Sequence, residues 1–140
     1  MTGKTGSVQL VEETVTAMGA KGDGRAGAYH AAFTLPGERV RGSARGDRLE
    51  DVEILSPSPE RASPSCAHFT ACGGCAVQHW ADGPIAAWKR GLVVQALERR
   101  GITAPVGETV AAWGSGRRRA AFHARRGPQG LAFGFSRARA

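Results

Sequence analysis

All three cysteines of this chain lie within ten residues, in the segment CAHFTACGGCAVQHW that spans residues 66–80. Their spacing is C-x5-C-x2-C, at Cys66, Cys72 and Cys75. In the tight C-G-G-C turn two thiolates can point at one metal, and the glycines let backbone amides approach the sulfur atoms. Three thiolates this close would repel one another unless a cation neutralised them. The segment is therefore a candidate metal site.

The spacing leaves three kinds of site open. An iron–sulfur cluster in its commonest form needs four ligands, so a fourth cysteine would have to come from elsewhere. A structural zinc ion could be completed locally by His68 or His79, which flank the cysteines. Alternatively, the cysteines are reduced and packed as small apolar side chains. The other two histidines, His30 and His123, fall in strand-like patterns and are more typical of partly buried aromatic residues than of ligands.

The composition is that of a small globular protein with many turns. The chain has 140 residues, of which 41% are hydrophobic and 22% charged, with 20 glycines and 7 prolines. These proportions favour short strands over a helical bundle. The sequence has neither an apolar run of membrane-spanning length nor an apolar signal core, which predicts a cytoplasmic protein. Because disulfides are rare in the cytosol, the cysteines favour a metal or catalytic site.

The positive charge is concentrated in the second half of the chain. The net charge is +7, with −1 in residues 1–55 and +8 in residues 56–140, and arginine makes up 16 of the 19 basic residues. Since the planar guanidinium suits phosphates and stacks on bases, we expect RNA as a partner. The densest basic site is Arg117, Arg118 and Arg119, in a stretch without acidic residues. The alternatives are a solvated edge strand and an arginine content that reflects a GC-rich genome.

Residues 1–58 are predicted to form a small β-barrel of the OB or TRAM type. Glycine-rich turns separate four short runs with partial alternation, which are SVQLVEETV (7–15), AGAYHAAFTL (26–35), ERVRGSAR (38–45) and RLEDVEIL (48–55). Closing these strands into a barrel would remove their exposed edges. Serines and prolines predict a linker over residues 59–65, so that residues 66–140 start a second domain.

The second domain is predicted to hold one helix and one β-hairpin, which makes the fold mainly β with an α+β part. In the helix, Asp82 is expected to cap the start and Gly101 to end it. Apolar residues recur on one face of this helix, at Ile85, Trp88, Leu92, Ala96 and Leu97. The hairpin turns at RGPQG, and its facing apolar residues are predicted to form a core. These residues are Ala120, Phe122, Ala124, Leu131, Phe133 and Phe135.

The order of these motifs resembles that of a known family. The pattern HF-x2-CGGC-x2-QH is followed by a helix ending in LERRGI, by W-G-x-G-RRRAAFHA and by a hairpin with LAFGFSR. This series resembles the N-terminal part of bacterial RNA uracil-5 methyltransferases of the 23S rRNA type. The earlier stretch DGRAGAYHAAFTLPGERVRG is similar to the TRAM domain of the same family. The resemblance covers nearly the whole chain, and its most specific element is the cysteine pattern.

The resemblance implies a 4Fe-4S cluster held by Cys66, Cys72 and Cys75, with the fourth cysteine beyond Ala140. The chain is then expected to be a fragment of a longer enzyme. In that family another cysteine adds to carbon 6 of uracil, carbon 5 attacks the methyl group of S-adenosylmethionine, and a carboxylate removes the carbon-5 proton. Those catalytic and cofactor-binding residues are expected beyond Ala140. The chain alone is expected to be a monomer that binds RNA, in particular rRNA, without methylating it.

Two functions of other classes remain as alternatives. One is a complete, zinc-stapled RNA-binding adaptor in which His68 or His79 provides the fourth ligand. The other is an iron–sulfur electron carrier, which would explain the cysteines but neither the barrel nor the +8 charge of residues 56–140.

Overall fold

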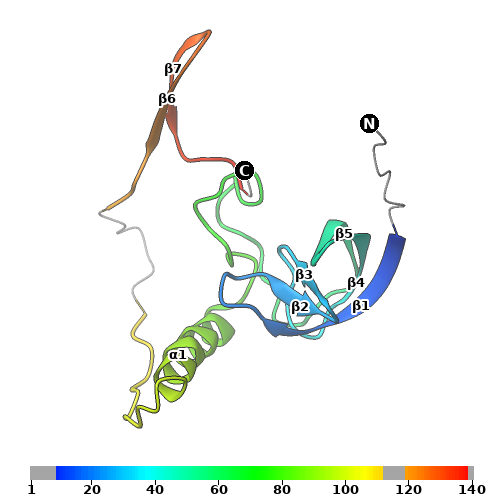
Figure 1. Cartoon of the computed structure of the whole chain (residues 1–140), viewed down its shortest axis with the longest axis vertical. Helices are drawn as coiled ribbons and strands as arrows, with labels where there is room; N and C mark the ends of the chain where they lie inside the picture. The colour runs from blue at the N-terminus through cyan, green and yellow to red at the C-terminus, as the bar shows by residue number, and fades with distance from the viewer. Residues whose placement is uncertain (1–8, 112–118, 139–140) are drawn as a thin grey trace, which may run out of the picture. The chain divides into compact units, whose positions relative to one another are not determined.

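A computed structural model describes residues 9–111 and 119–138. The chain divides into two compact units, Met1–Arg61 and Ala62–Ala140, each of which is described by itself. The described residues form a closed five-stranded barrel in the first unit and a helix and a two-stranded hairpin in the second (Figure 1). This confirms the predicted mainly β fold with one helix.

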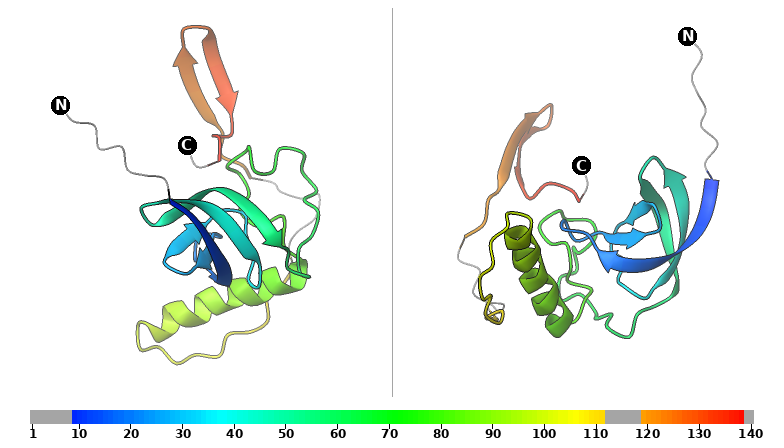
Figure 2. Two further views of the ribbon diagram at one scale, coloured as in Figure 1. Left: turned by 90° about the vertical axis from the view of Figure 1, so that its right-hand side faces the viewer. Right: turned by 60° about the horizontal axis from the view of Figure 1, so that its bottom comes forward.

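The barrel closes because its strands pair in the order β1-β2-β3-β5-β4, with β4 pairing back to β1 (Figure 2). Its strands are β1 (Gln9–Met18), β2 (Gly24–Ala26), β3 (Tyr29–Ala31), β4 (Arg39–Arg45) and β5 (Arg48–Ser56). The pairing of β3 with β5 is parallel, with Ala31 opposite Leu49, whereas the other pairs are antiparallel. Closure satisfies the backbone groups that a sheet edge would expose.

The barrel interior is small and filled by aliphatic side chains. The buried cluster consists of Val15, Ala26, Ala31, Val40 and Leu49. Partly buried side chains such as Tyr29 and Ile54 pack around this cluster. Because successive side chains of a strand point to opposite faces, alternate positions supply this interior and the positions between them face outward.

The run 26–35, predicted as one strand, is instead a tight hairpin followed by a turn. Ala26 pairs with Tyr29, and Gly27 between them has a φ of 58°, a left-handed conformation that favours glycine. The chain then turns again, with Thr34 and Leu35 buried. The sequence did not indicate this break, because a short, mostly apolar run has the same pattern in a strand as in a buried turn.

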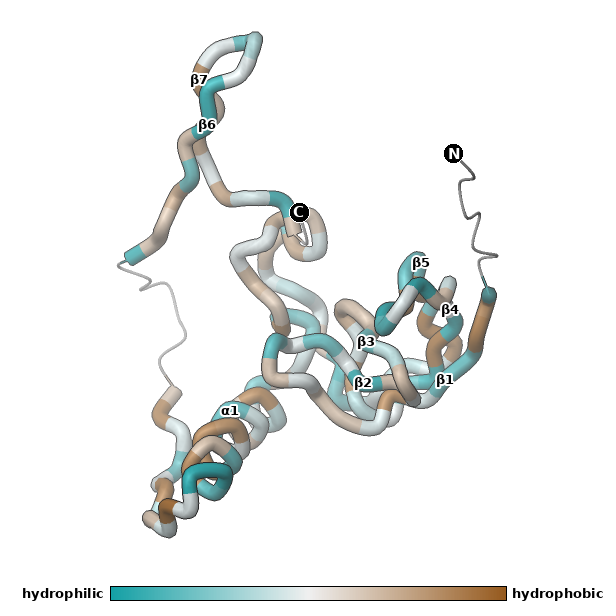
Figure 3. The backbone as a smooth tube through the Cα atoms, viewed as in Figure 1, coloured by the Kyte–Doolittle hydropathy of each residue, from teal (hydrophilic) through white to brown (hydrophobic). Residues whose placement is uncertain are grey.

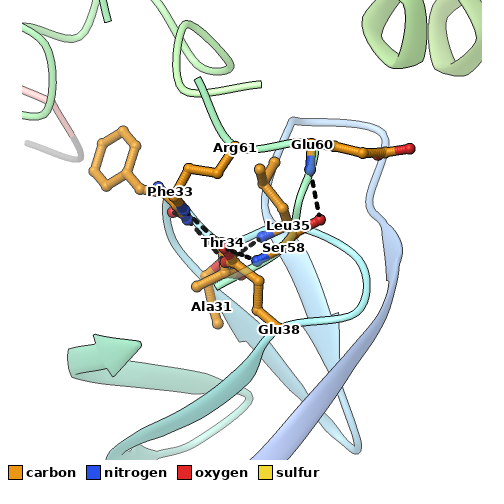
Figure 4. A network of polar contacts seen from close by, with 8 residues as sticks. All are labelled: Ala31, Phe33, Thr34, Leu35, Glu38, Ser58, Glu60 and Arg61. Atoms are coloured by element: carbon orange, nitrogen blue, oxygen red, sulfur yellow. Dashed lines mark hydrogen bonds and ion pairs between the residues drawn. The ribbon is translucent and has the colours of Figure 1, made fainter. Parts of the chain in front are cut away.

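A buried carboxylate ties the end of the first unit to the barrel (Figure 4). Glu38 is fully buried and accepts hydrogen bonds from the amides of Leu35 at 2.8 Å and Ser58 at 3.1 Å. The Arg61 guanidinium donates to both Glu38 oxygens, at 2.7 and 2.8 Å, and to the Phe33 carbonyl oxygen at 2.9 Å. The first part of the expected linker, up to Arg61, is therefore ordered by its contacts with Glu38, and the two units divide after Arg61.

Helix α1 (Asp82–Glu98) has the predicted apolar face but a different start. Ile85 is buried and Trp88 and Leu92 are half-buried, whereas Lys89 is exposed. The capping position is Ala81, which has extended backbone angles, so the prediction that Asp82 caps the helix was wrong. Asp82 is the first helical residue, where its negative charge suits the helix dipole. Gly101 ends the segment with a φ of 67°, as expected.

The hairpin is formed by β6 (His123–Gly127) and β7 (Gly130–Gly134). Its register places Ala124 opposite Phe133 and Arg126 opposite Leu131. The apolar face is present, but the prediction of a hairpin core was wrong. Phe122, Phe133 and Phe135 are 50%, 70% and 47% exposed. A two-stranded sheet has no second layer of its own, so it cannot bury a face by itself.

Hydrophobic and hydrophilic residues are interspersed along α1 and along the hairpin (Figure 3). Within the described ranges, no helix combines the length and the apolar character that crossing a membrane requires.

Candidate metal loop and basic hairpin

The cysteine loop, residues 66–78, contains successive turns that are closed by backbone hydrogen bonds. The amide of Phe69 donates to the Cys66 carbonyl oxygen at 3.1 Å, and the amide of Cys72 donates to the His68 carbonyl oxygen at 2.8 Å. Between them, Thr70 has a φ of 75°, which is an uncommon conformation for a β-branched residue. Such backbone strain persists where surrounding contacts enforce it and is frequent at functional sites.

Two nitrogen donors point at the sulfur atoms of this loop. The backbone amide of Gly74 donates to Sγ of Cys72 at 3.4 Å, and Nε2 of Gln78 donates to Sγ of Cys75 at 3.1 Å. The carbonyl oxygen of the same Gln78 side chain, Oε1, accepts a hydrogen bond from the backbone amide of Cys66 at 3.3 Å. Gln78 therefore links the first and the last cysteine. Donors of this kind stabilise the negative charge of a thiolate.

The segment after β7 holds the cysteine loop from one side. Cys72 and Arg137 form an antiparallel β-bridge. The amide of Gly73 donates to the Ser136 carbonyl oxygen at 2.9 Å, and the amide of Ala138 donates to the Ala71 carbonyl oxygen at 2.9 Å. A Cβ atom at Gly73 would lie 3.1 Å from both the Ser136 and Arg137 carbonyl oxygens, which is a tight contact, so this close approach favours glycine.

Aromatic contacts connect the end of the loop to the helix. The rings of Trp80 and Trp88 lie 6.1 Å apart between centroids, at an angle of 50°. Trp80 is buried, and it directly precedes the capping residue of α1. The loop is thus positioned by the helix at one end and by the segment after β7 along its middle.

The three cysteines have the chemistry that an iron–sulfur cluster or zinc requires, in an accessible position. All three are free thiols, with Cys66 and Cys75 exposed and Cys72 half-buried. Among the described residues, however, no group of three or more His, Cys, Asp or Glu side chains has a metal-binding arrangement. The three cysteines therefore suit an iron–sulfur cluster or zinc by donor type, by spacing in the sequence and by their N–H···S contacts, but not by the positions of their side chains.

The two histidines proposed as zinc ligands differ in their surroundings. His68 is exposed, whereas His79 is buried and its ring lies 5.3 Å from the Phe69 ring. His79 therefore contributes to the packing beneath the cysteine loop.

The predicted basic site is described only in part. Arg117 and Arg118 lie outside the described residues, whereas Arg119 is described and exposed. Arg119 lies before β6, which begins at His123, so the alternation of side chains along a strand does not determine to which side the Arg119 side chain points. Arg125 and Arg126 are also exposed, on β6 itself. The described part of the hairpin thus presents a positively charged surface.

Sequence reasoning missed two parts of this site. Gln78 belongs to the cysteine motif, but the motif alone gave it no role, although its spacing from Cys75 is the signal that could have suggested one. The pairing of Cys72 with Arg137 joins residues far apart in sequence, and no local pattern indicates it.

Comparison with known proteins relates the chain to RNA methyltransferases. No protein-family model matches the chain. An uncharacterized RNA methyltransferase of Brucella suis is 46% identical over 138 residues, which cover 96% of this chain and 32% of that protein. One from Caulobacter vibrioides is 48% identical over 133 residues, covering 90% and 32%.

A relative with a more specific name matches over a shorter region. The 23S rRNA (uracil(1939)-C(5))-methyltransferase of Chromohalobacter salexigens is 41% identical over 92 residues, which cover 62% of this chain and 19% of that protein. The chain is therefore homologous to RNA methyltransferases and spans about a third of the length of the first two of these relatives.

Proposed function

We propose that this chain is the RNA-binding and iron–sulfur portion of an RNA uracil-5 methyltransferase of the 23S rRNA type that uses S-adenosylmethionine. The observation that carries the proposal is the similarity at 46% identity along 96% of the chain to a named RNA methyltransferase. The relative named for uracil-C5 methylation of 23S rRNA supports the finer assignment.

In this proposal Cys66, Cys72 and Cys75 would hold a 4Fe-4S cluster together with one further cysteine. The amide of Gly74 and the side chain of Gln78 support this assignment, because both donate hydrogen bonds to these sulfur atoms. A bound cluster would supply a rigid cross-link between the two ends of the cysteine loop. Cysteines committed to such a cluster are unsuited to act as the nucleophile in methyl transfer.

The role of the chain itself would be to bind and place the RNA. The exposed arginines of the hairpin provide the charge that attracts phosphates, and the barrel provides a small closed β-structure of a kind that often binds single-stranded RNA. We assign no residue of this chain to methyl transfer or to binding S-adenosylmethionine. Those steps would belong to other parts of the enzyme.

The cluster proposal is tested by anaerobic reconstitution with iron and sulfide. We expect the full 140-residue chain to bind both, and Cys66→Ser, Cys72→Ser or Cys75→Ser to abolish the visible absorption of the cluster. Retention is expected to be weaker than in a longer polypeptide that supplies a fourth cysteine, because the cluster prefers four thiolates. Iron and sulfide analysis with absorption spectroscopy provides the measurement.

The zinc-stapled adaptor makes a different prediction for the same samples. It would show stoichiometric, tightly held zinc without sulfide, and His68→Ala or His79→Ala would release that zinc. That result would contradict the iron–sulfur proposal. His68→Ala is the cleaner variant, because His68 is exposed and its removal leaves the packing under the loop intact.

A further inference from the structure

A cavity lies where the cysteine loop meets the base of the hairpin. Its volume is about 330 Å³, and it is lined by Gly73, Gly74, His123, Phe135, Ser136 and Arg137 together with Ala121. All of these residues belong to the second unit. The absence of side chains at the two glycines leaves one wall as backbone. The other walls combine an aromatic residue, a histidine and an arginine.

An exposed row of aromatic rings leads away from this cavity. The Phe135 ring lies 4.8 Å from the Phe122 ring, which in turn lies 5.1 Å from the Phe133 ring, measured between centroids. All three phenylalanines are about half exposed or more. We call these three residues the phenylalanine row. Exposed aromatic rings that contact one another indicate a surface that binds a ligand or a macromolecular partner.

The positive charge around the phenylalanine row indicates which kind of partner it binds. Residues 119–138 carry four arginines and no acidic residue. The arginines Arg119, Arg125, Arg126 and Arg137 are all exposed, and Arg137 also lines the cavity. Aromatic rings beside arginines are the combination that binds unpaired nucleic-acid bases, whose rings stack while the phosphates meet the cations. An uncharged apolar protein segment that covered this face would gain nothing from the excess of positive charge.

We propose that the cavity receives a single unpaired base of an RNA strand, whose neighbouring bases stack along the phenylalanine row. Phe135 belongs to both the cavity and the row, so it would contact the inserted base and define its position. His123 and Arg137 offer hydrogen-bond donors to the edge of the base or to its phosphate. This inference rests on the proposed RNA-binding function and specifies which residues engage a base.

The test uses the full chain and an oligouridine of about twelve nucleotides carrying one 2-aminopurine, a length within the range that small RNA-binding domains cover. Binding is followed by fluorescence anisotropy, and stacking by quenching of the 2-aminopurine. We expect quenching on binding, and we expect Phe135→Leu to reduce it and to weaken binding by about fivefold to a hundredfold. Phe135→Tyr retains an aromatic ring and should restore both signals.

Two controls separate this inference from general RNA binding. Phe135→Leu removes no charge, so the dependence of log K on log salt should keep its slope, whereas Arg125→Ala should lower that slope by about 0.7. Circular dichroism of each variant checks its fold. Leu131→Ala, at an exposed apolar position outside the cavity, should leave quenching unchanged.

The outcomes distinguish the two proposals. Salt-dependent RNA binding by the wild-type chain, with quenching unaffected by Phe135→Leu, would overturn the base-pocket inference and leave the RNA-binding function standing. An absence of RNA binding by the wild-type chain would overturn both. If Phe135→Leu leaves RNA binding unchanged but reduces self-association of the chain, the phenylalanine row is a protein-binding surface and the inference is wrong.

Discussion

Glu38 shows how one residue can fix the end of a small domain. Burial alone would raise the pKa of its carboxyl group, but the hydrogen bonds from Arg61 and from the Ser58 and Leu35 amides together outweigh that effect. The pKa therefore lies below the ordinary value of 4.5. A carboxylate with a lowered pKa stabilises the folded state at pH values above its unfolded pKa. This contribution disappears as the pH falls through the lower pKa of the folded state.

We predict that the barrel loses stability as the pH falls below about 4.5, and that Glu38→Gln removes the part of this dependence that comes from Glu38. At neutral pH the same variant should destabilise the barrel by about 1–3 kcal/mol, because Arg61 and two amides lose their charged acceptor. Urea unfolding followed by NMR signals of Val15 and Val40 measures both effects.

Glu50→Gln is the matched control for this prediction. Glu50 pairs with Arg45 at 3.0 Å, but both side chains are largely exposed. An exposed ion pair contributes about 1 kcal/mol or less. If Glu50→Gln and Glu38→Gln had the same effect on stability and on its pH dependence, the hydrogen bonds of Glu38 with Arg61, Ser58 and Leu35 would not stabilise the barrel as predicted.

At the scale of an element, the hairpin combines two kinds of surface in a few residues. Its paired strands hold Phe133 opposite Ala124 and Leu131 opposite Arg126. A hairpin without a covering layer leaves both faces exposed, so its stability depends on cross-strand pairs and on the contacts at its base. The same exposure makes its charges available to a ligand.

We predict that charge reversal at Arg117 and Arg119, which precede the hairpin in the sequence, weakens RNA binding. The double variant Arg117→Glu and Arg119→Glu should bind less tightly and show a salt slope lower by about 0.7–0.9 for each phosphate that the variant no longer binds. Titrations at several salt concentrations provide the measurement. Charge reversal at Arg99 and Arg100, at the end of α1, is the control. An unchanged slope in the Arg117 and Arg119 variant would exclude these arginines as phosphate ligands.

At the scale of the whole molecule, the two units depend on different sources of stability. The first unit has a closed barrel and an aliphatic core. In the second unit, the described residues with buried side chains include His79, Trp80 and Ile85, and the cysteine loop is held by hydrogen bonds of its backbone and of the Gln78 side chain. Small domains with little core usually need a metal or another cross-link. If the second unit holds the proposed cluster, its stability should therefore depend on that cluster, whereas the stability of the first unit should not.

We predict that removing the cluster from the loaded chain loosens residues 62–138 and leaves the barrel intact. After treatment with an iron chelator, amide exchange should accelerate in the cysteine loop, with Val15 and Val40 still protected. Hydrogen-exchange mass spectrometry of the loaded and chelated chains makes the comparison. Equal acceleration in both units would show that the barrel also depends on the cluster.

The sequence by itself determined those features that depend on residues close together along the chain. The apolar face of α1, its end at Gly101 and the turn between β6 and β7 follow from local periodicity and from glycine conformation. The spacing of the three cysteines similarly defines a candidate metal loop, because all three lie within ten residues.

The tertiary structure alone decided the contacts between distant residues. It placed Arg61 on Glu38, closed the barrel by pairing β3 with β5, and brought Arg137 beside Cys72. It also showed that the three phenylalanines of the hairpin are exposed, although their alternation suggested a core. The physical reason is that periodicity reports which residues share a face, whereas burial depends on what the rest of the chain places against that face.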